Sequence, residues 1–214
     1  ISFYGRVNYS FNSKYLFQAT IRRDGSSAFG KNNRWGTFPS VSLAWRITEE
    51  NFMKNQKVFD DLKFRIGYGV SGNSLGFDAY TAQQTYGASG WFTYVDPVTG
   101  SSSSYRTLAA TKNANPDLKW ERTGMFNVGI DFGFFNNRLT GTFEIFKKKN
   151  DNMLVSRLHP GVLGGIAPST NSGKFEANGY DVSLTWHDKI GSFNYHVGGT
   201  LTYMTCLLYT SPSP

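Results

Sequence analysis

Apolar and polar residues alternate one by one over long stretches of this chain. Between Phe3 and Phe11, the odd positions are mainly apolar and the even positions mainly polar. A period of two places apolar side chains on one face of an extended strand and polar side chains on the other. Eight segments follow this rule: Phe3–Phe11, Tyr15–Arg22, Val41–Ile47, Leu62–Ser71, Trp120–Phe134, Leu139–Ile145, Tyr180–Trp186 and Phe193–Tyr203. The sequence therefore predicts an all-β chain of about eight two-faced strands.

The short links between these segments preserve the two faces. Asn136-Asn137 predicts a two-residue turn that pairs Phe134 with Leu139, because Asn tolerates the positive φ that tight hairpins need. Two further short links predict hairpins. Phe11 would pair with Tyr15 across a three-residue link, and Trp186 with Phe193 across Asp188–Gly191. Each pairing joins residues of the apolar face, as a correct register requires. We therefore expect an antiparallel meander.

Long and short links alternate along the chain. The long ones are Asp24–Trp35, Gly72–Leu118 and Asp151–Asn178, so all of them leave the same end of the sheet. Strands of about ten residues, with short turns at one end and long loops at the other, are typical of an outer-membrane β-barrel. A soluble β-sandwich also alternates, but its strands average about five or six residues. The pattern favours a transmembrane antiparallel barrel whose apolar face meets lipid.

The same parity predicts which side chains contact lipid. We expect this contact from one large residue on the apolar face of each of six strands. They are Phe17, Leu43, Phe64, Phe132, Phe143 and Leu184. The polar residues between them should face a wet lumen.

Composition excludes several other classes of protein. Charged residues make up 17% of the chain, and the 18 Phe, 12 Tyr and 5 Trp provide enough apolar surface to exclude disorder. No run approaches the roughly 20 apolar residues of a membrane-spanning helix. The single cysteine, Cys206, excludes a disulfide framework. The net charge of +7 comes from dispersed basic residues, which suits lipid headgroups better than nucleic acid.

No motif for catalysis, a cofactor or a metal emerges. Gly67–Gly72 matches the G-x-G-x-x-G dinucleotide pattern, but no helical pattern follows it. The three histidines, His159, His187 and His196, have no metal-site spacing and are interpreted as polar lumen or rim residues. Glu49-Glu50 after Thr48 is interpreted as a solvated turn, with one helical turn as the alternative. The sequence predicts a protein that is not an enzyme.

Aromatic residues gather in the link Gly72–Leu118 among Ser and Gly. Exposed aromatic rings stack on sugar rings or on peptide side chains, so we predict a ligand-contact role for some of them. The alternative is that they pack the link against the barrel mouth. The candidates are Tyr86, Trp91, Phe92, Tyr94 and Tyr105.

Several short motifs follow one another in a specific order and spacing. They are Arg23-Asp-Gly-Ser-Ser27, Phe29-Gly30, Asn33-Arg-Trp-Gly36, Phe38-Pro-Ser40, Ala44-Trp-Arg46, Lys63-Phe-Arg65 through Gly72-Asn73, Asn115-Pro-Asp-Leu-Lys-Trp-Glu121 and Asp131–Leu139. In these motifs the chain resembles SusC/RagA-like TonB-dependent outer-membrane transporters. The resemblance covers about residues 1–205. It implies a cell-outer-membrane barrel of about 22 strands with an N-terminal plug, driven by the TonB complex. It also implies a SusD-like surface lipoprotein over the mouth, and oligosaccharide or peptide as cargo.

Only part of such a transporter is expected here. Residues 1–205 would form eight barrel strands without the plug, so active uptake follows from the resemblance alone. The alternative is a self-contained eight-strand barrel with a structural or adhesive role, since eight strands make the smallest bacterial barrel. Residues 206–214 lose the alternation and end in two prolines, and they resemble translated sequencing-adapter read-through. A genuine loop is the alternative for this tail.

Overall fold

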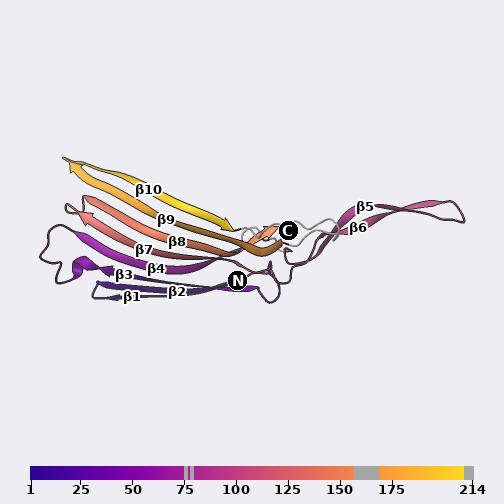
Figure 1. Ribbon diagram of the computed structural model, residues 1–214, viewed down its shortest axis with the longest axis horizontal. Coiled ribbons are helices and arrows are strands. Elements are labelled where there is room, and N and C mark those ends of the chain that lie inside the picture. Colours follow the sequence, from indigo (N-terminus) through magenta and orange to yellow (C-terminus); the bar gives the residue numbers. More distant parts are fainter. Residues whose placement is uncertain (75–76, 78–79, 157–168, 210–214) are drawn as a thin grey trace.

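A single curved antiparallel sheet dominates the chain (Figure 1). The structure, a computed structural model, describes residues 1–74, 77, 80–156 and 169–209. The sheet contains β1 (Ser2–Phe11), β2 (Tyr15–Gly25), β3 (Trp35–Arg46), β4 (Asp61–Asn73), β7 (Glu121–Phe134), β8 (Leu139–Ser156), β9 (Ser169–Ile190) and β10 (Phe193–Tyr209), in that order. It is open, with β1 and β10 at its edges. In the described part of the chain, no helix is long and apolar enough to cross a membrane.

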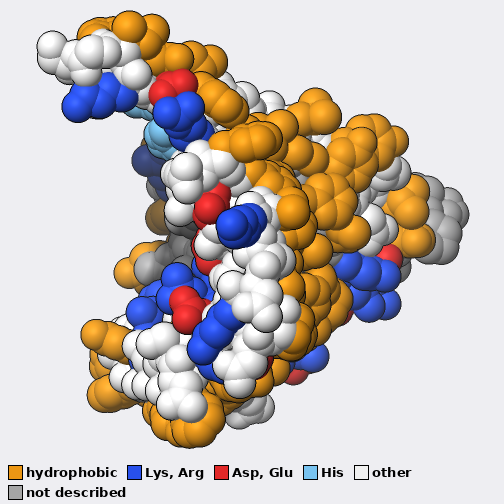
Figure 2. Space-filling model, turned by 90° about the vertical axis from the view of Figure 1, so that its left-hand side faces the viewer, with side chains coloured by type: hydrophobic (Ala, Val, Ile, Leu, Met, Phe, Trp, Pro, Cys, Tyr) orange, Lys and Arg blue, Asp and Glu red, His pale blue; other side chains and the backbone are white. Residues whose placement is uncertain are grey.

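The register places the two kinds of side chain on opposite faces. One row across the sheet runs from Leu43 through Ile66, Val128 and Ile145 to Tyr180. Viewed from the short-turn end, apolar side chains cover the convex side, and charged ones gather in the hollow (Figure 2). The eight-strand meander predicted from the alternation is confirmed.

Two predicted hairpins have the expected register, and one does not. Phe134 pairs with Leu139 and Phe11 with Tyr15, with positive φ at Asn136 and Asn12 in the two turns. The pairing of Trp186 with Phe193 is wrong, because Trp186 faces Val197. Gly191 has a φ of +60°, which permits a two-residue turn and lets β9 continue to Ile190. The shift is even, so the apolar face is preserved.

The link Gly72–Leu118 is not a structureless loop. It contains a hairpin of β5 (Thr85–Val95) and β6 (Ser102–Lys112), which forms a separate two-stranded sheet and projects past the long-link end of the large sheet (Figure 1). Its strands are rich in Ser, Thr, Gly and Ala, so the alternation that revealed the other strands is weak here. The β8 and β9 strands also extend further into their link than predicted.

A small buried core lies at the long-link end of the sheet. It consists of Phe29, Phe38, Leu118 and Trp120, of which Leu118 is fully buried. The Phe29 ring lies 4.5 Å from the Trp120 ring, between centroids. Trp120 precedes β7, so its predicted place in a strand is wrong. We call this cluster the aromatic knot, and it joins the link after β2 to the link before β7.

The C-terminal strand runs further than the alternation. Although consecutive apolar residues begin at Cys206, backbone pairing continues to Tyr209, which faces Lys174 of β9. Ladder hydrogen bonds use the backbone alone, so they tolerate the lost pattern. The expected end at residue 205 is therefore wrong for the strand, while the origin of residues 206–214 stays a prediction.

Candidate functional site: the polar concave face

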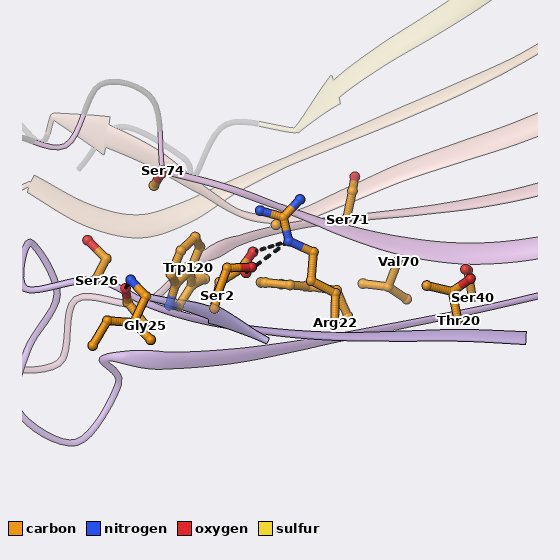
Figure 3. Close-up of a pocket in the computed structure, with 14 residues that line it drawn as sticks. Ser2, Thr20, Arg22, Gly25, Ser26, Ser40, Val70, Ser71, Ser74 and Trp120 are labelled. Carbon is orange, nitrogen blue, oxygen red and sulfur yellow. Dashed lines mark hydrogen bonds and ion pairs between the residues drawn. The ribbon is translucent and has the colours of Figure 1, made fainter. Parts of the chain in front are cut away.

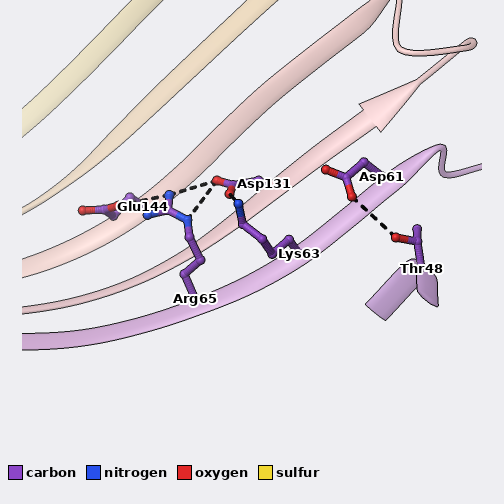
Figure 4. Close-up of polar contacts among 6 residues, drawn as sticks. All are labelled: Thr48, Asp61, Lys63, Arg65, Asp131 and Glu144. Carbon is purple, nitrogen blue, oxygen red and sulfur yellow. Dashed lines mark hydrogen bonds and ion pairs between the residues drawn. The ribbon is translucent and has the colours of Figure 1, made fainter. Parts of the chain in front are cut away.

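Four charged side chains form a continuous network in the middle of the concave face (Figure 4). Asp131 of β7 lies at its centre, 2.8 Å from Lys63 Nζ and 2.9 Å from Arg65 Nη2. The same Arg65 nitrogen lies 3.3 Å from Glu144 Oε2 on β8. Two cations and two carboxylates thus neutralise one another across three strands. Each side chain keeps between 18% and 33% of its surface exposed, so the network borders a wet space.

A glycine allows this network to cross β7. Gly129 lies between Arg65 and Glu144 in the register. A Cβ at Gly129 would lie 3.2 Å from Arg65 Nη2, so a side chain there would crowd the guanidinium. Asn127 adds a hydrogen bond of 3.1 Å from its amide nitrogen to Glu144 Oε1. The arrangement fixes the polar side chains along the wall.

Hydroxyl groups line a pocket where the concave face meets the long links (Figure 3). Thr20, Ser40 and Ser71 come from β2, β3 and β4, and the cavity holds about 540 Å³. At one side of it, Arg22 Nε and Ser2 Oγ both donate to Asp24 Oδ1, at 2.8 and 2.5 Å. Hydroxyls donate and accept hydrogen bonds, so this surface suits a neutral polar ligand such as a sugar or a peptide backbone.

The aromatic knot holds the links that border this pocket. Trp120 Nε1 donates to the carbonyl of Arg34 at 3.2 Å, and Asn33 Nδ2 donates to the carbonyl of Asp117 at 3.3 Å. Gly30 packs so closely on the carbonyl of Pro116 that a Cβ would overlap it. The motifs that carry the family resemblance therefore meet in space, although about 85 residues separate them.

Glu121 is an anchor that the alternation did not reveal. It is 8% exposed and accepts from Asn73 Nδ2 at 2.9 Å and from the Leu154 backbone N–H at 2.7 Å. Its carboxylate thereby joins β4, β7 and β8 at the long-link end. The sequence signals were its polar position in the alternating segment Trp120–Phe134 and its place in the Asn115–Glu121 motif; neither indicated its hydrogen-bond partners.

The five predicted ligand-contact residues all lie on the β5–β6 hairpin and are exposed. The register divides them between its two faces. Phe92 pairs with Tyr105, and Tyr94 shares their face. A bulge between Ala88 and Gly90 places Tyr86 on the other face with Trp91, whose ring centroid lies 6.0 Å from the Arg106 guanidinium carbon. Both the ligand-contact role and the alternative, packing against the barrel mouth, stay predictions for these residues.

The other candidate motifs have structural roles. Gly67–Gly72 lies inside β4 and pairs with β7, so it is not the strand-to-helix turn of a dinucleotide site. His187 and His196 pair with each other near the short turns, with ring centroids 6.0 Å apart. His159 lies outside the described residues. In the part that the structure describes, no three His, Cys, Asp or Glu side chains cluster as metal ligands.

The acidic pair after β3 is not simply a solvated turn. A short 3₁₀ helix, η1 (Ile47–Glu49), follows the strand, and its N-cap is Arg46 rather than Thr48. Glu50 accepts from Tyr15 Oη at 2.7 Å, Trp45 Nε1 at 3.2 Å and Lys14 Nζ at 3.2 Å. These bonds, led by that from Tyr15, hold the pKa of Glu50 below its usual range.

Comparisons with known proteins agree with this geometry. The family model described as "TonB dependent receptor-like, beta-barrel" matches residues 1–213. TonB-dependent receptor SusC of Bacteroides thetaiotaomicron is 38% identical over 185 residues, which are 86% of this chain and 18% of that protein. TonB-dependent receptor P3 of Formosa agariphila is 36% identical over 184 residues, again 86% of this chain and 18% of that protein. The chain thus spans about a fifth of the length of these relatives.

Solved structures show the same wall. The RagAB peptide transporter matches with a TM-score of 0.82 and 28% identity, covering 97% of this chain and 22% of that one. The siderophore receptor PirA from Pseudomonas aeruginosa matches with a TM-score of 0.59 and 16% identity, covering 96% of this chain and 34% of that one, which shows the fold alone.

Proposed function

Because this chain belongs to the TonB-dependent receptor-like β-barrel family, we propose that it forms eight wall strands of a transporter that imports oligosaccharides or peptides. The family's members are integral β-barrels of the outer membrane, and so is the protein that contains this chain. The observation that carries the proposal is the division of one sheet into an apolar convex face and an ion-paired concave face. Such a wall separates lipid from a wet passage.

In this proposal, the concave face lines the route of the cargo. The Lys63–Asp131–Arg65–Glu144 network is internally neutral, so it presents hydrogen-bonding groups without a strong field of either sign. The hydroxyl pocket near Trp120 would receive cargo at the mouth. The exposed aromatic rings of the β5–β6 hairpin would supply stacking contacts outside it. The six large apolar residues predicted to face lipid all lie on the convex face.

The partners belong to the same proposal. A SusD-like surface lipoprotein would cover the mouth, and the TonB complex would act through parts of the receptor other than this wall. Affinity purification of the full-length receptor from outer membranes should recover one such lipoprotein. The eight-strand barrel alternative requires β1 to pair with β10, and the structure instead has both strands at the edges of an open sheet. The transporter is therefore the function that the geometry supports best.

Deletion of the gene in the source bacterium tests the transport function. The mutant should lose growth on at least one oligosaccharide or peptide mixture that supports the wild type, while growth on the corresponding monomers stays normal. Restoring the intact gene on a plasmid should restore growth. Unchanged growth on every polymer that the wild type uses would contradict an import role.

A further inference from the structure

Basic residues form a belt on the convex face, toward the long links. The register of β7, β8 and β9 places Arg122, Lys147, Lys149 and Lys174 on this face. Directly below, the rows are apolar, as in the row of Val128, Ile145 and Tyr180. From this belt down to Asp188 near the short turns, the convex face of these three strands carries no charged side chain. The belt therefore marks the edge of the apolar band.

The belt contains a groove of about 480 Å³. Tyr68 and Phe126 form an apolar part of its lining, and Arg122, Lys147 and Lys149 supply cations. Gly124 leaves the space open, because its missing side chain would point toward the Tyr68 hydroxyl, 3.4 Å from a Cβ. An apolar floor that continues into the apolar band, with a cationic rim, fits an amphiphile with an anionic head.

The cations of the groove are only partly neutralised. Lys149 Nζ lies 3.7 Å from Asp151 and 3.8 Å from Glu176, both long ion pairs. Arg122 Nη2 donates to the carbonyl of Thr37 at 3.1 Å, which orients the guanidinium without cancelling its charge. Among the described residues, no carboxylate forms an ion pair with Lys147. The belt as a whole has four basic residues against two acidic ones, so it keeps a positive charge.

We propose that this groove binds the phosphate of an anionic lipid in the outer leaflet. The phosphate lies between Lys147, Lys149 and Arg122, and an acyl chain descends over Phe126 and the apolar rows below it. Phosphate accepts several charge-assisted hydrogen bonds, which Lys and Arg donate. Basic residues at the level of anionic headgroups each contribute to membrane attachment. The inference rests on the proposed position of the convex face in the membrane, and it concerns lipid binding rather than uptake.

The Lys147-Lys148-Lys149 run provides a matched control. Lys148 pairs with Met125 and Ala177 on the concave face, whereas its two neighbours face outward. The full-length receptor, purified in detergent, would be incubated with monophosphoryl lipid A or with its dephosphorylated form. Native mass spectrometry would then count the retained lipid. We expect the wild type to retain more of the phosphorylated lipid than of the dephosphorylated one. The ratio of the two should fall about tenfold in the variant K147Q/K149Q. K148Q should retain it like the wild type.

Further measurements separate the roles of charge, acyl chain and folding. K147R/K149R should retain the lipid, because both charges remain. Inorganic phosphate alone should not displace it at equal concentration, since it lacks the acyl chains. Heat-modifiable gel mobility and uptake should be unchanged in K147Q/K149Q, which separates failure of the lipid site from failure of the transport function. Equal retention of both lipids by the wild type, or equal loss in K148Q and K147Q/K149Q, would overturn the proposal, as would displacement by phosphate alone.

Discussion

At the scale of single residues, neighbours in this sequence face opposite environments. Thr142 pairs with Asp131 on the concave face, while Phe143 pairs with Ile130 on the convex face. The two residues are adjacent in the chain, but the side chain of Thr142 faces the wet lumen and that of Phe143 faces lipid. A charged side chain should therefore destabilise the protein more at position 143 than at position 142, because hydrocarbon cannot solvate the charge and a wet lumen can.

Replacing Phe143 with Arg in the full-length receptor should destabilise it by about 2–4 kcal/mol, the cost of a cation near the middle of the lipid band. Thr142→Arg places the same charge beside Asp131, and should change stability by less than about 1 kcal/mol. Urea unfolding followed by heat-modifiable gel mobility measures both. Similar losses in the two variants would show that the two faces are assigned wrongly.

Because of Glu50, the stability of the folded protein should depend on pH at the short-turn end. Its pKa in the folded protein is lowered, first by the Tyr15 hydrogen bond and then by those from Trp45 and Lys14. The stabilisation is therefore present above the ordinary pKa of a Glu, about 4.3, and is lost as pH falls through the lower folded value. Urea midpoints of the wild type should drop between about pH 5 and pH 3, and this drop should shrink in Glu50→Gln. Glu49→Gln, which removes none of these bonds, should keep it.

At the scale of elements, the links are more ordered than their composition suggests. The aromatic knot packs Phe29 and Phe38 around Trp120, with centroid distances of 4.5 and 5.5 Å. It fixes the links at the rim of the hydroxyl pocket. The β5–β6 hairpin, in contrast, forms a sheet of its own beyond the rim.

A substitution at Gly30, which lies against Pro116, tests whether the aromatic knot holds the two links together. Gly30→Ala should force the two links apart and cost about 1–3 kcal/mol, the usual range for overpacking. Limited proteolysis should then cut the links after β2 and before β7 sooner, while the barrel itself still assembles. Gly199→Ala is the control, because a Cβ there meets nothing within 4 Å. Equal protease resistance in both variants would mean that the knot does not hold the links.

Substitutions in the β5–β6 hairpin should weaken cargo binding without affecting assembly of the barrel. Ala substitution of Phe92, Tyr94 and Tyr105 removes the aromatic rings of one face. If these rings stack on cargo, cargo affinity should fall by at least about tenfold, since stacking contributes about 0.5–1.5 kcal/mol per ring. Isothermal titration on the purified receptor measures the affinity, and gel mobility measures assembly. The double variant of Tyr86 and Trp91 tests the opposite face in the same way. Unchanged affinity in both would exclude a cargo role for the hairpin.

At the scale of the whole molecule, the sheet is an open wall. Its edge strands β1 and β10 present unpaired backbone groups. In hydrocarbon, each such group costs several kcal/mol. The charged residues of the concave face already have partners within the sheet. Lys63 and Arg65 neutralise Asp131 and Glu144. Glu121 accepts hydrogen bonds from Asn73 and from the Leu154 backbone.

Residues 1–205 expressed alone should therefore not form a stable barrel in detergent. The two open edges should promote aggregation. Size-exclusion chromatography and heat-modifiable gel mobility of the refolded segment check this. A sharp, protease-resistant monomer with barrel-like mobility would instead support the small eight-strand barrel.

The sequence by itself determined the eight strands of the large sheet and their two faces. A period of two assigns each side chain to the convex or the concave face. This assignment is correct even at Trp186, whose predicted partner was wrong, because the pairing is shifted by an even number of residues. The hairpin at Asn136 followed from local backbone preference. Both properties depend on residues close in the chain, so the printed sequence suffices for them.

Only the tertiary structure decided which distant residues meet. The partners of Arg65 on β7 and β8, and those of Trp120 in the link after β2, lie from 66 to 91 positions away. The β5–β6 hairpin was missed because small residues on both its faces give no alternation. The lipid groove depends on Gly124 standing between side chains of three strands. Such arrangements follow from register across a whole sheet, which no local pattern contains.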